Sequence, residues 1–242
     1  MSEEEDRGRI ELIVGPMFSG KSTRLIENIR KSAYKAKKTI MVSFFADKRY
    51  TQKSEVVTHD LMKYDSIDCK NLTDKFDILK TYDIIGIDEG QFFQDLVKCC
   101  EKLADMGNLV IVAALNGDFL RESFPVIANL IPKVDKIKLL QAYCFNCHKI
   151  AQYSLRTVES NEKILIGSGE AYKPACRKCY KYFSKAREMG SFEVIKEAEK
   201  SSRKENEDIN QKTADITPSK DKENKIQQNL MKTPEEFRQE NE

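Results

Sequence analysis

The stretch Gly15-Pro16-Met17-Phe18-Ser19-Gly20-Lys21-Ser22 decides the fold of this chain. It fits the phosphate-binding pattern G-x-x-x-x-G-K-[ST], follows the apolar run Ile10–Val14, and precedes apolar residues at helical spacing. In such a strand–loop–helix unit the backbone N–H groups bind phosphates, Lys21 adds positive charge at the β- and γ-phosphates, and Ser22 can ligate Mg²⁺. The stretch therefore predicts a site for a nucleoside triphosphate with Mg²⁺. It does not name the reaction, because ATPases, GTPases, helicases and small-molecule kinases share this loop.

Three further apolar runs predict buried strands: Thr39–Phe44, Ile84–Ile87 and Leu109–Leu115. Between the last two, apolar residues from Phe93 to Ala104 recur at helical spacing. Strands that alternate with helices form parallel βαβ units, so we predict the α/β class. The expected architecture is a P-loop NTPase (RecA-like) domain whose parallel sheet is covered on both faces.

The composition limits the location and the partners of the chain. Its net charge is +2 over 242 residues, which gives no general attraction to nucleic acid or membrane. No apolar run approaches the roughly 20 residues that span a bilayer, and the polar N-terminus lacks the apolar segment of a signal peptide. We therefore expect a cytoplasmic protein in a reducing compartment, with neither membrane nor nucleic acid as a partner.

Two adjacent acids, Asp88 and Glu89, follow the apolar run Ile84–Ile87. Asp88 stands where an aspartate holds the Mg²⁺ shell in P-loop enzymes. Because neighbouring residues of a strand point to opposite faces, Glu89 is aimed differently and is free to act as a base. Its target is either water, in an ATPase, or a substrate hydroxyl, in a kinase. The aromatic residues Phe92 and Phe93 suit a flat, heteroaromatic substrate.

Four cysteines form two C-x-x-C pairs, Cys144 with Cys147 and Cys176 with Cys179, with 28 residues between the pairs. Two such pairs complete a closed, tetrahedral Zn²⁺ site. A haem attachment sequence, which ends here at His148, would leave the second pair without a role. A thioredoxin-like pair would need a βαβ context, and a regulatory disulfide needs no second pair. We therefore expect a structural zinc that does not catalyse.

Changes of composition divide the chain into four parts. Beyond about Gly190 the sequence is rich in Lys, Glu, Asn, Gln and Ser, and it has too few large apolar residues to offset the entropy of ordering. The expected parts are a flexible N-terminus over 1–8, the P-loop domain over 9–142, a zinc-binding domain over 143–190 and a disordered charged tail over 191–242.

The chain resembles the zinc-containing, P-loop (type II) thymidine kinases from about Arg9 to Phe183. The motifs that carry the resemblance, in family order, are 15–23 (GPMFSGKST), 88–93 (DEGQFF), 113–119 (AALNGDF) and the two cysteine pairs. The resemblance implies that the γ-phosphate of ATP is transferred to the 5′-hydroxyl of thymidine, giving dTMP and ADP in pyrimidine deoxynucleotide salvage. It also implies a lasso loop on the zinc domain that closes over thymidine, a homotetramer, and feedback inhibition by dTTP.

The resemblance implies a role for each matching residue, beginning with Glu89 as the base that accepts the proton of the 5′-hydroxyl. The residues implied at ATP and Mg²⁺ are Gly15, Pro16, Met17, Phe18, Ser19, Gly20, Lys21, Ser22, Asp47, Lys48, Arg49, Asp88 and Gln91. The residues implied around thymidine are Met17, Phe92, Leu115, Phe119, Lys163, Ile164, Leu165, Ile166, Gly167 and Tyr172. The zinc ligands are Cys144, Cys147, Cys176 and Cys179.

Two positions depart from the family pattern, and the tail has no counterpart in its motifs. Asn116 stands where the family commonly has aspartate, and Lys173 replaces a histidine that often follows the lasso tyrosine. The tail contains two KEN triplets, Lys204–Asn206 and Lys222–Asn224. KEN is a degron for the eukaryotic cell-cycle ubiquitin ligase, and vertebrate cytosolic members of the family carry such a signal. A tail of this composition also produces KEN by chance.

Three other functions compete with thymidine phosphorylation. A zinc-bearing P-loop ATPase acting on nucleic acid would need a basic, aromatic strand groove, which the near-neutral charge disfavours. A zinc-ribbon interaction module with a regulatory nucleotide site would leave the acids at 88 and 89 without a task. A kinase for another nucleoside, such as deoxyuridine, is only weakly disfavoured by the sequence.

Overall fold

The computed structural model describes residues 8–33, 37–45, 55–57, 63–160, 165 and 171–201. Within these residues the main sheet has seven strands in the order β3-β4-β2-β5-β6-β1-β7. Their bounds are β1 Arg9–Gly15, β2 Thr39–Phe44, β3 Glu55–Val57, β4 Lys63–Cys69, β5 Ile84–Ile87, β6 Leu109–Leu115 and β7 Lys136–Leu139. All are parallel except β3, which pairs antiparallel with β4. The predicted α/β class is confirmed, and β1, β2, β5 and β6 are the four predicted strands.

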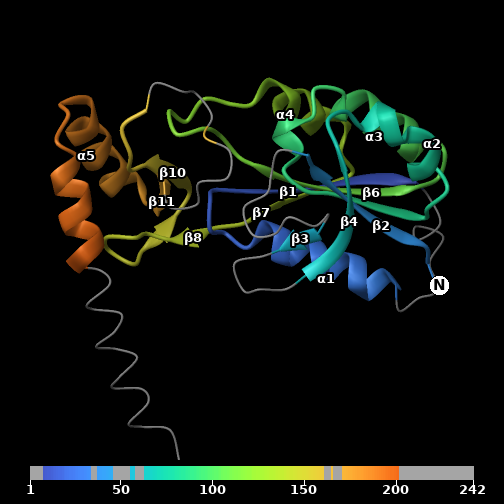
Figure 1. The fold of residues 1–242 in the computed structure, drawn as a ribbon, viewed down its shortest axis with the longest axis horizontal. Coiled ribbons are helices and arrows are strands. Elements are labelled where there is room, and N and C mark those ends of the chain that lie inside the picture. Colours follow the sequence, from blue (N-terminus) through green and yellow to red (C-terminus); the bar gives the residue numbers. More distant parts are fainter. Residues whose placement is uncertain are drawn as a thin grey trace, which may run out of the picture. The chain divides into compact units, whose positions relative to one another are not determined.

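Helices cover both faces of this sheet. They are α1 Lys21–Ala33, α2 Phe76–Leu79, α3 Leu96–Asp105 and α4 Pro125–Leu130, with short 3₁₀ turns η2 Leu72–Lys75, η3 Gly90–Phe92 and η4 Ile131–Lys133. Figure 1 shows α1 on one face and α2, α3 and α4 on the other. The connections between parallel strands therefore place helices on both sides, as parallel sheets require.

The two faces of β1 belong to two separate apolar clusters. Ile10, Leu12 and Val14 pack with residues of α3 in the larger cluster, whereas Ile13 packs with Leu25 and other residues of α1 in the smaller one. A strand with apolar neighbours on both faces reads as a continuous apolar run, which explains why β1 was visible in the sequence. This packing fixes the direction in which β1 delivers the loop that follows it.

The strand register brings the predicted motifs to one edge of the sheet. Gly15, the last residue of β1, pairs with Leu115, the last residue of β6. On the other side of β6, Ile87 at the end of β5 pairs with Val112. Ligands of open α/β sheets bind outside the carboxyl ends of the strands. The segments that follow Gly15, Ile87 and Leu115 therefore meet at the edge where such a ligand binds.

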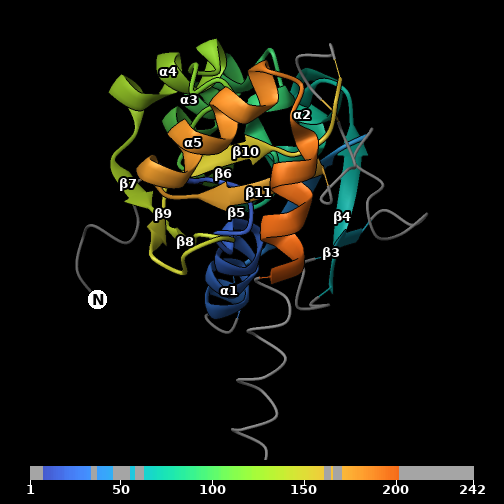
Figure 2. The same cartoon turned by 90° about the vertical axis from the view of Figure 1, so that its left-hand side faces the viewer.

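A second group of elements follows the main sheet in the chain, and in Figure 2 this group faces the viewer. Its elements are β8 Ala142–Tyr143, β9 Ile150–Ala151, β10 Tyr153–Arg156, β11 Tyr172–Ala175 and α5 Arg177–Glu188. In the described residues β8 pairs with β9 and β10 with β11, both antiparallel. These elements share one apolar cluster that includes Leu155, Phe183 and Ile195. We call residues 142–201 the annex.

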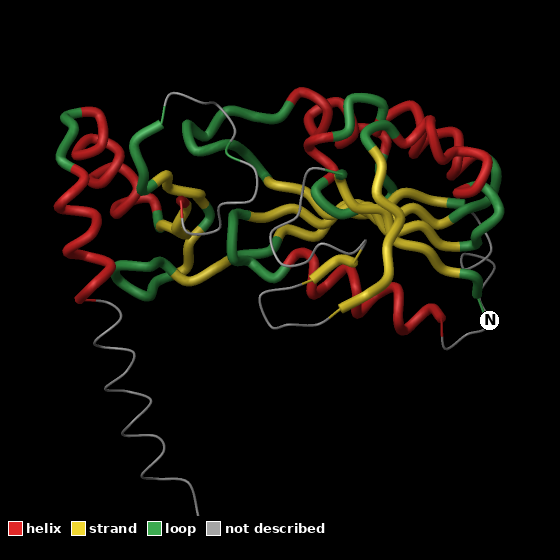
Figure 3. Tube along the Cα trace, viewed as in Figure 1, coloured by secondary structure: helices red, strands yellow, loops and turns green. Residues whose placement is uncertain are grey.

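The first residues of the stretch that its composition assigned to the tail form a helix. Residues 192–201 are helical, as Figure 3 shows in red after α5. Ile195 is fully buried in the annex cluster, and Phe192 and Val194 pack against it. The helical propensity near Phe192–Arg203 favours such an extension of a terminal helix, and the few apolar residues of the stretch give the helix an amphipathic face. Residues 202–242, with both KEN triplets, lie outside the described residues.

Among the described helices, none has the length and apolar character of a membrane span.

Asp95 joins the segment before β5 to the start of α3. Its carboxylate accepts hydrogen bonds from the backbone N–H groups of Leu72, at 3.2 Å, and of Thr73, at 2.8 Å, and from the Thr73 hydroxyl. Partial burial opposes ionisation, but the hydrogen bonds from Thr73 and Leu72 outweigh it, so the pKa of Asp95 is lowered from 3.8. Asp95 therefore caps the N-terminus of η2 from outside that turn.

We expect Asp95→Ala to lower the free energy of unfolding by about 1–2 kcal/mol at pH 7, because the η2 cap is lost. The folded-state pKa of Asp95 lies below the unfolded value of 3.8, so its contribution is complete above that pH and disappears as the pH falls through the folded pKa. Urea unfolding of both proteins across this range measures the difference. Asp77→Ala is the control, because Asp77 forms an exposed ion pair with Lys80 and its loss should leave the midpoint nearly unchanged. A difference that stays constant with pH would contradict the assignment.

Candidate active site

The phosphate-binding stretch forms a tight loop between β1 and α1. Phe18 and Gly20 have positive φ angles, of 63° and 77°. A Cβ at Gly20 would meet no atom within 4 Å, so the left-handed backbone, rather than crowding, favours glycine there. At Gly15 a Cβ would lie 2.5 Å from Oγ of Ser19, so the loop folds closely over the end of β1. The stretch between β1 and α1 is therefore a compact loop with left-handed backbone at Phe18 and Gly20.

Lys21 places a cation inside this loop. It is the first residue of α1, and its side chain is buried. Its Nζ donates a hydrogen bond of 2.7 Å to the carbonyl oxygen of Pro16. The first turn of α1 carries no acidic residue, so the partial positive charge of the helix N-terminus is not offset there. A buried ammonium beside a helix N-terminus is an arrangement suited to phosphate oxygens.

Ser22 and Asp88 come together although 66 positions separate them. Oγ of Ser22 donates a hydrogen bond of 3.0 Å to Oδ1 of Asp88. Asp88 is buried, and its own backbone N–H donates to the carbonyl oxygen of Val42, on the neighbouring strand β2. A serine hydroxyl and a carboxylate are the hard oxygen ligands that Mg²⁺ takes together with phosphates. The donor set fits the Mg²⁺ site expected from the sequence.

Glu89 is held in an unusual backbone conformation beside Asp88. Its φ of 52° and ψ of 41° are left-handed, which is rare for glutamate and costs of order 1–3 kcal/mol. Its side chain is buried, and Oε2 accepts a hydrogen bond from Nε2 of Gln91. Oε1 of Gln91 in turn accepts from the backbone N–H of Leu115, at 3.1 Å. Gln91, expected at ATP and Mg²⁺, thus ties Glu89 to the end of β6.

The annex contacts the loops at the carboxyl edge of the sheet. Oγ of Ser154 accepts a hydrogen bond of 3.0 Å from the backbone N–H of Met17. Nδ2 of Asn116 donates to the carbonyl oxygen of Gln152 at 3.0 Å, so the residue that replaces the family's aspartate joins the two parts. The sequence did not single out Ser154, because a serine within a short strand carries no motif signal.

The aromatic residues expected around thymidine lie in two groups. The ring centroid of Phe92 is 5.3 Å from that of Phe44, on β2. Phe119 lies against the annex, where the hydroxyl of Tyr180 donates a hydrogen bond of 2.6 Å to its carbonyl oxygen. Tyr172 belongs to the Phe119 side, through Arg156. The predicted residues outside the described part of the chain are Asp47, Lys48, Arg49, Lys163, Ile164, Ile166 and Gly167.

The four predicted zinc ligands form one cluster in the annex. The sulfur atoms of Cys144, Cys147, Cys176 and Cys179 all lie within 4.8 Å of one another. Sγ of Cys147 is 3.6 Å from Sγ of both Cys176 and Cys179. A tetrahedron with Zn–S bonds of about 2.3 Å has edges of about 3.8 Å, so the cluster fits a zinc ion. Nδ2 of Asn146 also donates to Sγ of Cys179, at 3.4 Å.

The remaining cysteines behave as small apolar residues. Cys69, Cys99 and Cys100 are buried in the larger cluster of the main sheet. Burial, together with the charge of Asp95, raises the pKa of Cys69 to about 12 and that of Cys99 to about 11. Thiols with such pKa values hardly ionise near neutral pH, so these cysteines are inert. His59 lies outside the described residues.

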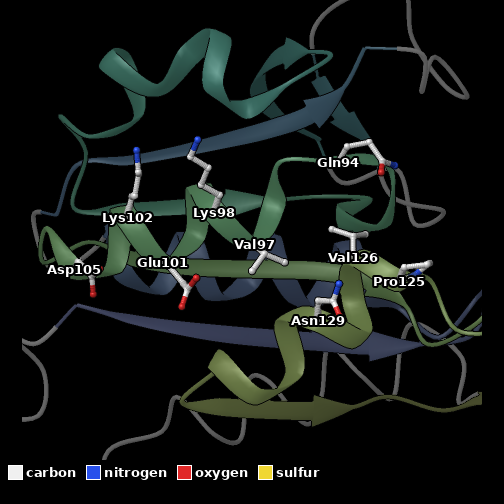
Figure 4. A pocket seen from close by; sticks show the side chains of 9 residues that line it. All are labelled: Gln94, Val97, Lys98, Glu101, Lys102, Asp105, Pro125, Val126 and Asn129. Atoms are coloured by element: carbon white, nitrogen blue, oxygen red, sulfur yellow. The ribbon is translucent and has the colours of Figure 1, made fainter.

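A groove also runs between α3 and α4, with a volume of about 610 Å³ (Figure 4). It is lined by Gln94, Val97, Lys98, Glu101, Lys102, Asp105, Pro125, Val126 and Asn129. None of these residues was predicted at ATP, thymidine or zinc. Its rim carries both lysines and acids, so it favours no single class of ligand.

Comparison with known proteins identifies the family of this chain. The sequence profile of the thymidine kinase family matches residues 8–180. The chain is 42% identical over 173 residues to the thymidine kinase of vaccinia virus (strain Western Reserve), covering 72% of this chain and 97% of the viral one. It is 45% identical over 175 residues to the thymidine kinase of sheeppox virus (72% and 98%), and 43% identical over 176 residues to thymidine kinase 1 of Dictyostelium discoideum (72% and 78%). The chain therefore belongs to the thymidine kinase family.

Proposed function

We propose that this chain is a thymidine kinase that uses Mg²⁺-bound ATP to phosphorylate the 5′-hydroxyl of thymidine. The observation that carries the proposal is the hydrogen bond between Ser22 and Asp88, with the buried carboxylate of Glu89 next to it. This arrangement supports the proposal, because the loop, two oxygen groups of the kind that Mg²⁺ prefers and a buried carboxylate lie at one edge of the sheet. Phosphoryl transfer is largely a matter of positioning and of stabilising charge, and these residues supply both.

Each residue acts on a different part of the reaction. Lys21 and the N-terminus of α1 hold the phosphates and stabilise negative charge as the γ-phosphoryl group moves. Ser22 and Asp88 would hold Mg²⁺, which would neutralise negative charge on the phosphates. Glu89 accepts the proton of the 5′-hydroxyl as the oxygen attacks the γ-phosphorus, and ADP leaves on the opposite side. Because Gln91 fixes Glu89, the base is oriented before the substrate binds.

The nucleoside is proposed to bind between the P-loop and the annex. Met17, Leu115 and Phe119 come from the loops at the carboxyl edge, and Ser154 and Tyr172 come from the annex. The hydrogen bond of Ser154 to Met17 supports this location, because it holds the two sides of the pocket together. Apolar and aromatic surfaces with a few fixed polar groups suit a neutral pyrimidine.

We expect Glu89→Gln to lower kcat for thymidine by about 10²–10⁴-fold, because it removes the general base. The KM for ATP should stay near that of the wild type, since Glu89 lies outside the phosphate loop. The measurement is transfer of labelled phosphate from ATP to a panel of thymidine, deoxyuridine, deoxycytidine and guanosine. Glu101→Gln is the control, because Glu101 lies on α3 and pairs with Lys133. A variant with wild-type kcat would contradict the role of Glu89 as the base. A higher rate of the wild type with another nucleoside would contradict the assignment of thymidine as the substrate.

We further propose that the annex carries one structural zinc. Four cysteine ligands fill a tetrahedral shell and leave no position for a substrate. Sulfur ligands also favour zinc over Mg²⁺, so the two metals do not compete for one site. The metal then fixes β8, β11 and α5 relative to one another, because its ligands lie in or beside these elements. Since the annex supplies Ser154 and Tyr172, loss of the metal should be felt at the nucleoside.

Cys147→Ser is expected to lower the zinc content well below one ion per chain and to raise the KM for thymidine more than the KM for ATP. The reason is that the phosphate loop belongs to the main sheet, whereas one side of the nucleoside pocket belongs to the annex. Elemental analysis and steady-state kinetics measure the two effects. His148→Ala is the matched control, because His148 is exposed and adjacent to Cys147; it should keep both zinc and activity. Full activity without zinc would disprove the role.

We also propose that the chain is a homotetramer, that dTTP inhibits it and that it acts in the cytoplasm. These proposals rest on membership of the family. The expected outcome is a mass of four chains by light scattering and inhibition by dTTP that thymidine relieves. A monomer insensitive to dTTP would refute both.

Recognition of the tail by a ubiquitin ligase is a separate proposal. If the tail is recognised, replacing both KEN triplets by alanines should lengthen the half-life of the chain at mitotic exit.

A further inference from the structure

Arg156 is a buried cation that the roles proposed above do not use. It is the last residue of β10, and only 1% of its surface is exposed. Arginine is almost never fully buried unless other groups satisfy its charge. A buried guanidinium in a domain of this size therefore needs a reason, and the contacts of its side chain supply one.

The guanidinium lies between residues from two different parts of the chain. Its Cζ is 3.7 Å from the ring centroid of Phe119, in the loop after β6. The same atom is 5.3 Å from the ring centroid of Tyr172, on β11, and Nη2 of Arg156 donates a hydrogen bond of 2.6 Å to the Tyr172 hydroxyl. Arg156 and Tyr172 are also direct partners in the β10–β11 register. One side chain thus touches two residues of the proposed thymidine pocket.

The Tyr172 hydroxyl extends this link by one more step. It accepts a second hydrogen bond, of 3.4 Å, from the backbone N–H of Leu165. Phe119 is fixed independently of the guanidinium, since its carbonyl oxygen accepts from Tyr180. The series Phe119, Arg156, Tyr172, Leu165 therefore runs from the loop after β6, across both strands of the small sheet, to the segment before β11.

The chemistry of arginine suits this place better than that of lysine. A guanidinium is planar, so it can stack on the ring of Phe119 and donate a hydrogen bond in its own plane to Tyr172. The attraction between a cation and an aromatic ring is stronger when both are removed from water. Such a contact fixes the orientation of the ring, whose centroid also lies 4.8 Å from the guanidinium carbon of Arg187 on α5.

We propose that Arg156 is a positioning residue for the nucleoside: it holds Phe119 and Tyr172 in a fixed relative orientation and so sets the affinity for the base. It acts through these two residues and does not touch the phosphates. The inference rests on the proposed thymidine pocket, and it adds a residue that none of the sequence motifs contains. It predicts that Arg156 and Tyr172 act as one unit, so their effects on nucleoside affinity are not additive.

The test is a double-mutant cycle with Arg156→Met and Tyr172→Phe. Each single variant should raise the KM for thymidine about tenfold, the effect of losing one hydrogen bond to a charged group. The double variant should be little worse than Arg156→Met, and the KM for ATP should not change. Arg156→Lys should recover part of the loss, because an ammonium still donates to the Tyr172 hydroxyl. Arg177→Met, which removes an exposed cation stacked 5.1 Å from the ring of Tyr153, is the matched control.

A second measurement separates this inference from the proposed function. Backbone amide exchange at Leu165 should be faster in Arg156→Met and in Tyr172→Phe than in the wild type, whether or not thymidine is the substrate. Thermal unfolding and zinc content, which should match the wild type, show that the annex is intact. Additive effects in the cycle, an equal rise in the KM for ATP, or unchanged exchange at Leu165 would each overturn the positioning role. If exchange at Leu165 is faster in the variants but the wild type phosphorylates another nucleoside, only the assignment of thymidine as the substrate is overturned.

Discussion

The hydrogen bond between Ser22 and Asp88 joins the two motifs on which the rest of the site depends. Ser22 is in the first turn of α1, and Asp88 follows β5, so this one contact spans the sheet from the helix on one face to the end of a central strand. It can form only because β5, β6 and β1 are neighbours in parallel register. That order places the phosphate loop, the acids and the segment after β6 side by side. Glu89 and Gln91 then extend the network to Leu115. Gln91 holds the side chain of Glu89, whose backbone is left-handed. Strand order thus brings the three segments together, and the side chains then make the short contacts of the site.

The annex has a different relation to the site, because it contributes surface and orientation. Its own elements are short: β8 and β9 have two residues each, and β10 and β11 have four. Strands of that length do not hold a fold together by themselves; here they share a small apolar cluster, beside the four cysteines proposed as zinc ligands. Ser154 and Arg156 both lie on β10, one bonded to the phosphate loop and the other to Phe119 and Tyr172. A strand of four residues therefore contacts both the phosphate loop and two residues of the proposed nucleoside pocket.

Sequence reasoning succeeded where a pattern has one physical cause. Continuous apolar runs predicted the four central strands, because strands covered on both faces must be apolar throughout. Spacing alone predicted the phosphate loop and the cysteine cluster. It failed where tertiary contacts decide. β7 is exposed along all four of its residues, and β4 mixes charged and apolar residues, so neither strand stands out as an apolar run. Composition placed residues 192–201 in the tail, although helical propensity near Phe192–Arg203 allowed a helix there. The helix packs because a few apolar residues in a charged stretch suffice once an apolar cluster is present. Arg156 could not be found at all, because burial of an arginine has no signature in a single sequence.

The exposed strand β7 has a consequence for anyone who wishes to rebuild this protein. It is the last strand in the sheet order, it pairs with β1, and its residues Lys136, Ile137, Lys138 and Leu139 all face solvent in the described structure. Alternating lysines on such an edge oppose unwanted pairing with other chains. The residues proposed for catalysis, by contrast, sit at the carboxyl ends of the central strands. An added strand, grafted in register beside β7, would lengthen the sheet sideways without touching those ends. The geometry makes this edge the natural attachment point for a fused reporter or a designed binding module.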